Sequence, residues 1–286
     1  MGIIGSRVTV NLRKAGYLVL TWSRTPRTEP DFLSSPLEVA KNTRIIQIFV
    51  ANGQALHEVV AAMEPALTPE HIILNHATIA PEEVRRVAEM VGSRKARFVD
   101  APFTGSRDAA AAGQIVFIVG GDPDTLEAVR PILEINARQI VPVGGIGDAM
   151  TVKIAANLLI AVTTIACAES LALLSNAGIP LQRFSEMLRF NGARSPIAEM
   201  KIPPMILDHF ETHFALKHML KDIRIALSLA AEHNTSLPTA EAFVAQAERA
   251  TEKGWSDADY SVIARLLGFP DSQASLDEEF RNGIKK

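Results

Sequence analysis

The secondary-structure signals in this chain change in kind at about residue 143. Before that point, runs rich in β-branched residues alternate with helical stretches. The runs cover residues 18–22, 44–50, 72–74, 98–99, 115–119 and 140–141, and the helical stretches cover 36–41, 53–63, 81–90 and 123–133. This alternation predicts a parallel sheet with helices on both faces, whose ligands bind at the carboxyl ends of the strands. We therefore expect an α/β fold, a Rossmann-type doubly wound parallel sheet, over residues 1–145.

After residue 146 the strand signals disappear and long helical patterns take their place. These patterns cover residues 148–177, 181–190, 195–208, 216–234 and 238–253, and glycine, proline and asparagine separate them. We expect an all-helical domain over residues 146–268, and a loose polar tail over 269–286.

Composition narrows the class of protein. The 286 residues are 48% hydrophobic and 21% charged with a formal net charge of −3, which gives no reason to expect nucleic acid or an anionic membrane as a partner. The single cysteine, Cys167, excludes a disulfide framework, and no cluster of histidines or carboxylates has metal-ligand spacing. No signal peptide is visible, and the longest uncharged stretch, residues 154–168, is shorter than the ~20 residues needed to cross a bilayer. We expect a cytoplasmic protein in which this stretch is a core or interface helix.

The N-terminus contains part of a nucleotide-binding pattern. Gly2-x-x-Gly5, followed by Ser6, opens a helix that leads to the run at 18–22. This order matches the back half of a dinucleotide fingerprint, in which glycines let the backbone approach a pyrophosphate and the helix N-terminus supplies amides. Taken alone, Gly-x-x-Gly is equally consistent with an ordinary helix start.

A complete unit of this kind has a strand and a further Gly-x before Gly2. In the strand order 3-2-1-4-5-6 that strand lies in the middle of the sheet, and its loss would leave buried backbone groups unpaired. Two explanations remain open. Either the true start lies upstream, which we favour, or the chain is a truncated product with a damaged cofactor site.

The loop after residues 18–22 bears on the choice of cofactor. It reads Ser23-Arg24-Thr25, and no acidic residue occurs before Glu29. An acidic residue here would bind the ribose hydroxyls of NAD, whereas an arginine suits the 2′-phosphate of NADP. The loop therefore favours NADP over NAD, the alternative being a solvated arginine with no ligand.

Two polar residues interrupt the apolar helix predicted from residue 148. Lys153 and Asn157 are four positions apart and therefore lie on one face. A lysine at the head of such a helix is costly to bury unless it can lose its proton or find a partner, and a proton donor near neutral pH needs that property. The alternative is a lysine whose stem lies on the core while its ammonium group reaches water.

Over about residues 2–268 the chain resembles the β-hydroxyacid dehydrogenases, the family of 3-hydroxyisobutyrate dehydrogenase. Four family motifs occur in order: Gly2-x-x-Gly5; the Asp-Ala-Pro motif at residues 100–106; Gly145, Gly147, Lys153 and Asn157; and Lys221-Asp222 preceded by Phe214 and Leu216. The resemblance implies hydride transfer between NADP or NAD and a small β-hydroxyacid or its semialdehyde. It also implies that the helical domain over residues 146–268 serves substrate binding and dimerisation, and that the protein is a homodimer or homotetramer.

The resemblance assigns a role to each motif residue. Lys153 would be the general acid or base, and Asn157 would hold it or the substrate oxygen. Lys221 would close over the anionic end of a small carboxylate-bearing substrate, whose carboxylate would bind at Thr104, Gly105 and Ser106. The expected cofactor contacts are Gly2, Gly5, Ser6, Ser23, Arg24, Thr25, Thr78 and Asp222. Asp222 would also orient either Lys221 or the contact between the domains.

Several positions depart from the family pattern. Thr104 replaces a serine, and Ser106 replaces a glycine as in the glyoxylate-reductase-like branch. Residues 75–78 read Asn-His-Ala-Thr where Asp-x-Ser-Thr is common. The changes at Asn75 and Ala77, together with the missing first strand, keep a second function open, a non-catalytic dinucleotide-fold scaffold for interaction or oligomerisation. The two lysines argue against it, because a scaffold has no physical need for them.

Overall fold

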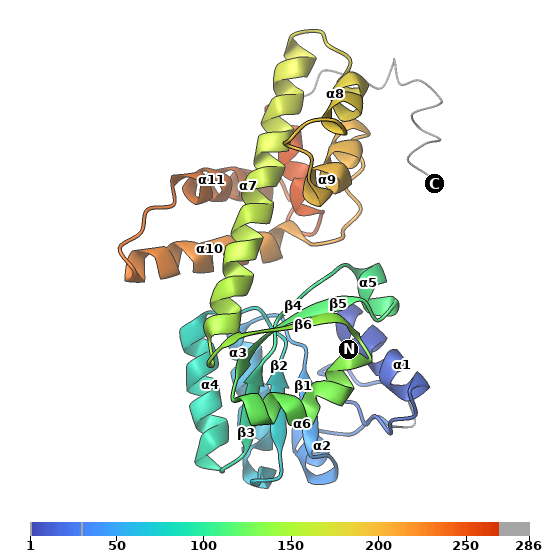
Figure 1. The fold of residues 1–286 in the computed structure, drawn as a ribbon, viewed down its shortest axis with the longest axis vertical. Helices are drawn as coiled ribbons and strands as arrows, with labels where there is room; N and C mark the ends of the chain where they lie inside the picture. Colours follow the sequence, from blue (N-terminus) through green and yellow to red (C-terminus); the bar gives the residue numbers. More distant parts are fainter. Residues whose placement is uncertain (1, 30, 269–286) are drawn as a thin grey trace. The chain divides into compact units, whose positions relative to one another are not determined.

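The computed structural model describes residues 2–29 and 31–268 of the chain (Figure 1). The chain divides into two compact units, Met1–Ile154 and Ala155–Lys286. The division falls inside the long helix α7 (Asp148–Asn176). The tail expected at 269–286 lies outside the described residues.

The first unit contains a six-stranded mixed sheet. Its path is β1-β2-β3-β5-β4, with β6 paired to β5. The strands are β1 (Ile45–Ile48), β2 (Ile72–Asn75), β3 (Arg97–Asp100), β4 (Phe103–Thr104), β5 (Ile115–Gly121) and β6 (Ala137–Gly144). Strands β1 to β3 are parallel, whereas β5 runs antiparallel to β3 and β4 and parallel to β6. The predicted Rossmann-type α/β fold is confirmed, and its sheet is mixed because β5 enters in the reverse direction.

Helices cover both faces of this sheet, and the alternation of side chains along the strands explains why. In β2, Ile73 packs into one apolar cluster while Ile72 and Leu74 pack into the other. The first cluster contains residues of α2 (Pro36–Asn42), α3 (Gly53–Met63) and α4 (Pro81–Ser93), and the second contains residues of α1 (Ile3–Lys14), α5 (Arg107–Ala111) and α6 (Pro123–Glu134). A single turn, η1 (Glu64–Ala66), follows α3.

Local signals set where several of these helices begin. Ser35, Asn52 and Asp122 precede α2, α3 and α6, and each side chain accepts a hydrogen bond from a backbone N–H of the first turn. Both α2 and α6 have proline at their first position, where the missing N–H costs nothing. These boundaries are therefore encoded in the sequence nearby.

The strand expected at residues 18–22 does not form, so this prediction was wrong. Thr21 makes only an isolated parallel bridge to Phe32, and Leu18 is 79% exposed. In the expected order this run pairs with a strand that would precede Gly2. None of the described strands takes that place, and a run of high β-propensity without a partner has no ladder to join.

The second unit is helical, as predicted. Its helices are the later part of α7, then α8 (Leu181–Leu188), α9 (Pro196–Ile206), α10 (Leu216–Glu232) and α11 (Pro238–Glu252), and the turn η2 (Tyr260–Leu267) follows. Its core consists of two apolar clusters. One contains Leu216, Ile223, Phe243 and Tyr260, and the other contains Leu171 and Ile202.

Helix α7 is unusually apolar for a helix that is only partly covered. Its 29 residues include an 18-residue window of mean hydropathy 2.0, of which 39% is buried inside the chain. By length and composition alone this helix is able to cross a membrane, a test that core helices of soluble proteins also pass. Leu159 and Leu173 are 69% and 72% exposed. The helix therefore presents more apolar surface than the chain itself covers.

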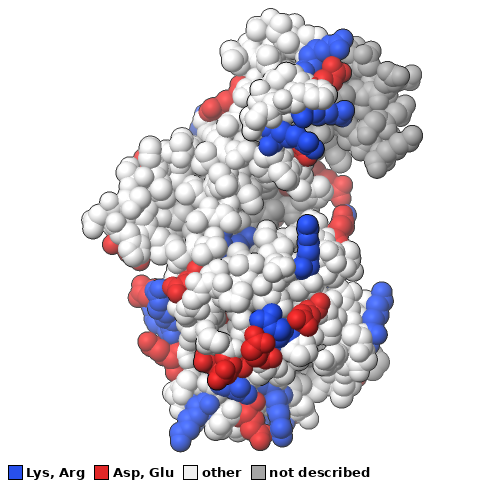
Figure 2. Space-filling view, in the orientation of Figure 1, with Lys and Arg blue, Asp and Glu red and all other residues white. Residues whose placement is uncertain are grey.

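Charges on the surface are of mixed sign. Figure 2 shows Lys and Arg side chains interspersed with Asp and Glu on the face drawn. Many are paired along one helix, as Arg86 is with Glu82 in α4 and Arg130 with Glu127 in α6. Such exposed pairs contribute little to stability, because water and salt screen them.

Candidate functional site

Lys153 lies in the second turn of α7, just after the glycine-rich turn. Its residue exposure is only 8%. The turn needs its glycines: Gly147 has φ +92°, and a Cβ there would lie 3.1 Å from the Arg85 guanidinium. The carboxylate of Asp148 accepts a 2.8 Å hydrogen bond from the backbone N–H of Gly145. The start of α7, and with it Lys153, is thus fixed by backbone geometry.

Strand β5 packs directly on this first turn. A Cβ at Gly120 would lie 2.3 Å from the carbonyl oxygen of Gly145 and 3.3 Å from Cβ of Ala149. No side chain fits between the strand and the helix. The cross-strand neighbour of Gly120 is Asp100, at the end of β3.

Asp100 is a fully buried carboxyl group close to the start of α7. Its Oδ1 accepts a 3.4 Å hydrogen bond from the Asn75 amide, and its Oδ2 has no partner among the described residues. Burial raises the pKa of Asp100 to about 7, although the Asn75 amide and the backbone of Gly147 and Met150 oppose the shift. Sequence reasoning did not single out Asp100. The available signal was its position at the head of the Asp-Ala-Pro motif.

The neighbouring segment after β2 is also locked in place. His76 is buried and stacks on Phe49 at 4.4 Å between ring centroids, with its ring nitrogens 2.6 Å from the Ala101 oxygen and 3.0 Å from Gln47 Oε1. Burial lowers the pKa of His76 to about 4, so its ring is neutral at pH 7. The Asn75 side chain accepts from the Ala77 N–H at 3.0 Å. Thr78, half-buried, follows this turn.

The residues expected to bind a carboxylate lie in one strand-to-helix turn. Thr104 ends β4 and is half-buried, Gly105 has φ +146°, and Ser106 is the exposed N-cap of α5. The Ser106 hydroxyl accepts a 3.1 Å hydrogen bond from the Ala109 N–H. The structure therefore brings the three residues together, and the positive φ requires the central glycine.

The beginning of α1 fits an anionic ligand. Gly2 is its N-cap, with no side-chain cap and no acidic residue in the first turn. Nothing lies within 4 Å of a Cβ built on Gly2, so an approaching phosphate meets backbone amides in open space. Gly5 is buried, with its Cβ position 3.3 Å from Phe49, and the Ser6 hydroxyl donates to the Ile3 oxygen. Gly2 thus suits the pyrophosphate of a dinucleotide, whereas Gly5 serves close packing.

The loop expected to choose the cofactor is largely exposed. Arg24 and Thr25 are exposed, and Ser23 is half-buried. The Ser23 hydroxyl donates to the Thr25 carbonyl at 2.8 Å, which closes the loop around Arg24. The geometry leaves the guanidinium accessible to a ligand.

In the second unit, Asn157 and Lys221 both contact Asp222. The Asn157 amide donates to Asp222 Oδ2 at 2.6 Å, and Lys221 Nζ donates to Oδ1 at 2.6 Å. Asn157 and Asp222 are 3% and 1% exposed, whereas Lys221 is half-buried. Sequence reasoning paired Asp222 with Lys221 but missed its link to Asn157, because contacts between distant helices leave no local pattern.

Two family matches cover nearly all of this chain. Residues 1–145 match the NAD binding domain of 6-phosphogluconate dehydrogenase, and residues 147–267 match the NAD-binding domain of NADP-dependent 3-hydroxyisobutyrate dehydrogenase. The chain belongs to the β-hydroxyacid dehydrogenase family. As a member of this family it is an NAD(P)-dependent hydroxyacid dehydrogenase or reductase.

Individual relatives agree with this family. The chain is 28% identical over 277 residues to glyoxylate/succinic semialdehyde reductase 2 of Arabidopsis thaliana, covering 93% of this chain and 77% of the relative. It is 26% identical to the NAD-dependent L-serine dehydrogenase of Pseudomonas aeruginosa, covering 93% and 95%. The solved structure of Mycobacterium tuberculosis 3-hydroxyisobutyrate dehydrogenase with L-serine has the same fold, with a TM-score of 0.86, 23% identity and coverage of 93% and 96%.

Proposed function

We propose that this β-hydroxyacid dehydrogenase interconverts a small β-hydroxyacid and its semialdehyde or oxo acid, with Lys153 as the acid and base. When bound, the nicotinamide ring supplies or accepts the hydride at the carbinol carbon. Lys153 then gives a proton to the substrate oxygen in reduction and takes it back in oxidation. The observation that carries this role is a lysine 8% exposed at the start of an apolar helix whose first turn is held by backbone contacts.

Asn157 acts one helical turn after Lys153. Its amide donates to Asp222, which leaves the amide oxygen free to accept a hydrogen bond from an ammonium group or a substrate hydroxyl. A fixed amide dipole at this place orients the proton donor without itself titrating. Asp222 is therefore proposed to orient both Asn157 and Lys221.

The substrate is proposed to carry a carboxylate. Thr104, Gly105 and Ser106 offer a hydroxyl and backbone amides in one turn, which suits an anion. Lys221 is proposed to supply a positive charge to the substrate. Glyoxylate, succinic semialdehyde and L-serine, which occur in the names of the relatives, are the first substrates to test.

The cofactor is proposed to be NADP in preference to NAD. The first turn of α1, without acidic residues, binds the pyrophosphate, and the accessible Arg24 between Ser23 and Thr25 binds the 2′-phosphate. Thr78 is proposed to meet the nicotinamide ribose. We also propose a homodimer or homotetramer, since α7 leaves large apolar side chains such as Leu159 and Leu173 exposed.

The test is a coupled pair of measurements on the purified chain. Binding of NADPH and NADH is followed by fluorescence, and turnover is followed by absorbance with glyoxylate, succinic semialdehyde and L-serine. The proposal expects tighter binding of NADPH and turnover of at least one substrate that depends on Lys153. Turnover that survives Lys153→Ala would overturn the assignment of the acid and base.

The unformed strand at residues 18–22 favours a second candidate, a non-catalytic dinucleotide-fold scaffold. Asn75 also stands where the family commonly has an aspartate. This candidate expects a stable oligomer with no turnover of any substrate, whether or not the cofactor binds. Turnover by the unmodified chain excludes it.

A further inference from the structure

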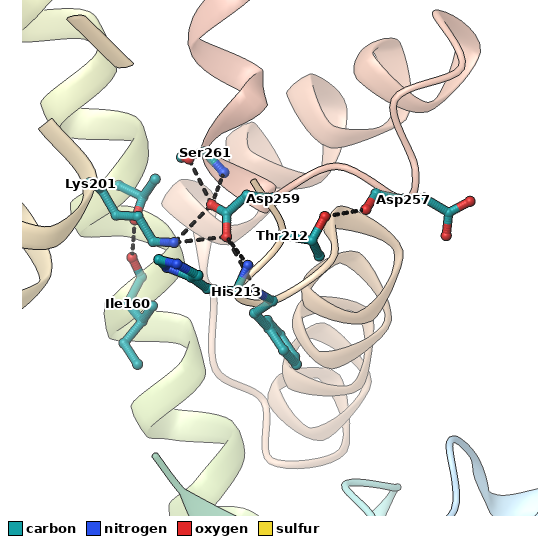
Figure 3. A network of polar contacts seen from close by, with 9 residues as sticks. Ile160, Lys201, Thr212, His213, Asp257, Asp259 and Ser261 are labelled. Atoms are coloured by element: carbon teal, nitrogen blue, oxygen red, sulfur yellow. Dashed lines mark hydrogen bonds and ion pairs between the residues drawn. The ribbon is translucent and has the colours of Figure 1, made fainter. Parts of the chain in front are cut away.

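A buried ion pair lies in the second unit, outside the residues assigned to the reaction. Lys201 of α9 and Asp259, just before η2, are each 2% exposed. Lys201 Nζ donates to both carboxylate oxygens of Asp259, at 2.8 and 2.9 Å (Figure 3). It also lies 4.3 Å from the centroid of the Tyr260 ring. Burial lowers the pKa of Lys201, which the charge of Asp259 opposes.

A buried ion pair is weak evidence of a stabilising role. Removing two charges from water is costly, and apolar residues of similar volume often replace such pairs with no loss of stability. The other contacts of Lys201 and Asp259 indicate what the pair does.

Asp259 binds more than Lys201. Its Oδ2 accepts from the backbone N–H groups of His213 and Phe214, both at 3.2 Å. Its Oδ1 accepts from the N–H and the hydroxyl of Ser261, at 3.1 and 2.7 Å. Figure 3 shows these donors converging on the carboxylate from different segments. One buried carboxylate thus ties α9, the start of η2 and the segment that enters α10.

The segment entering α10 is fixed by the same region. Ala215, the N-cap of α10, offers no side-chain cap. Instead, the N–H groups of Leu216 and Lys217 donate to the carbonyls of Ala258 and Ser256, at 2.9 and 3.0 Å. The exposed N–H groups of a helix start need partners, and here residues 256–258 supply them. The register of α10 therefore depends on the placement of residues 256–259.

Helix α10 carries Lys221 and Asp222 in its second turn. Asp222 holds both Lys221 and Asn157. We propose that Lys201 and Asp259 are positioning residues: their buried pair sets the start of α10 and thereby the place of Lys221 for the substrate carboxylate and of Asp222 for Asn157. This inference rests on the proposed function for its catalytic consequence, but the placement of α10 is measurable without any activity.

The main test variant is Asp259→Asn, which keeps the size of the side chain and removes its charge. In the variant, an NH₂ group replaces one of the two carboxylate oxygens. This group donates hydrogen bonds and does not accept them, so the backbone N–H groups or the ammonium group that donated to that oxygen lose their acceptor. Hydrogen exchange of the amides of residues 213–217 should speed up by at least about tenfold, because hydrogen bonds to a charged acceptor are stronger than those to a neutral one. In parallel, KM for the carboxylate substrate should rise about tenfold or more, with the Kd of NADPH unchanged.

The matched control is Arg224→Met, which removes an exposed ion pair to Glu248 from the same helix α10. It should leave exchange at residues 213–217 and KM unchanged. Should Asp259→Asn fail to fold, Lys201→Met serves in its place, since Asp259 then keeps its four donors from the backbone and Ser261. Lys201→Met is expected to speed up exchange and to raise KM in the same direction, but by smaller factors.

The outcomes are distinguishable. Faster exchange at residues 213–217 together with a raised KM supports the proposal. A folded variant with unchanged exchange overturns it, and so does faster exchange with an unchanged KM, because the pair is then only structural. If the unmodified chain turns over no substrate, the proposed function fails. The exchange measurement then still decides whether the pair places α10. Unchanged exchange in Asp259→Asn refutes this placement, and faster exchange supports it.

Discussion

Asn157 of α7 donates its side-chain amide to Asp222 of α10 across 2.6 Å, and both residues are almost completely buried. This contact fixes the orientation of the amide, because Asp222 accepts only from the nitrogen. The amide oxygen is left to face the other way. A residue identified from its spacing to Lys153 is thus held in place by a helix more than 60 positions later in the chain.

The first prediction concerns this pair. Replacing Asp222 by Ala should lower kcat/KM by about ten- to a hundredfold, since it removes the acceptor for Asn157 and for Lys221. Asn157→Ala should lose part of the same activity. In a double-mutant cycle the two losses should couple by ~0.5–3 kcal/mol. Additive losses would show that the contact has no role in the reaction.

The second prediction concerns Lys153. Lys153→Ala should remove most of kcat, about 10²–10⁴-fold, because no general acid then meets the substrate oxygen. The Kd of NADPH should stay within about twofold, measured by fluorescence. Lys217→Ala is the matched control, an exposed lysine paired with Asp257 that should keep normal kcat. Near-normal turnover by Lys153→Ala would sink the assignment.

Much of the fold follows from local sequence patterns. The helices from α7 to α11 begin and end within about two residues of the expected positions because apolar periodicity and the breaks at glycine and proline are local signals. Strand β4 and helix α5 were missed, since two strand residues and five helical ones are too short to leave a period. The run at 18–22 had strand composition but no partner strand, and composition alone does not supply one.

The candidate site also has parts that local sequence patterns predict and parts that they do not. Lys153, Asn157 and the turn at 104–106 were predicted from spacing and motif order, and their roles stay predictions. The raised pKa of Asp100 was not predicted, because it comes from burial beneath the start of α7. Lys201 and Asp259 were missed too, as 58 positions separate them and each looks like an ordinary charged residue in sequence. Tertiary burial of charge is not visible before the chain is folded.

The third prediction concerns the choice of cofactor. Arg24→Asp should weaken NADPH binding much more than NADH binding, because it sets a carboxylate against the 2′-phosphate. Fluorescence titration of both cofactors measures the ratio of the two Kd values. Arg27→Asp, in the same loop, tests whether any charge reversal there has this effect. Equal losses for NADPH and NADH in Arg24→Asp would contradict the preference for NADP.

The last prediction concerns pH and Asp100. Burial raises its pKa to about 7 in the folded protein, well above the ~3.9 of an exposed aspartate. Between these two values the folded state binds a proton that the unfolded state lacks. The free energy of unfolding therefore includes a contribution that is fully present below about pH 4 and is lost as the pH rises through about 7.

Asp100→Asn should remove this contribution to the pH dependence, because an amide does not titrate. Urea unfolding at pH 5 and pH 8 should show a smaller fall in stability for Asp100→Asn than for the unmodified chain. Asp124→Asn, an exposed carboxylate in α6, serves as the control and should keep the original dependence. Since Asp100 lies beside the first turn of α7, the kcat of the unmodified chain should also change near pH 7, and that change should be absent in Asp100→Asn. Identical pH profiles of stability in the two proteins would show that Asp100 keeps one protonation state throughout this range.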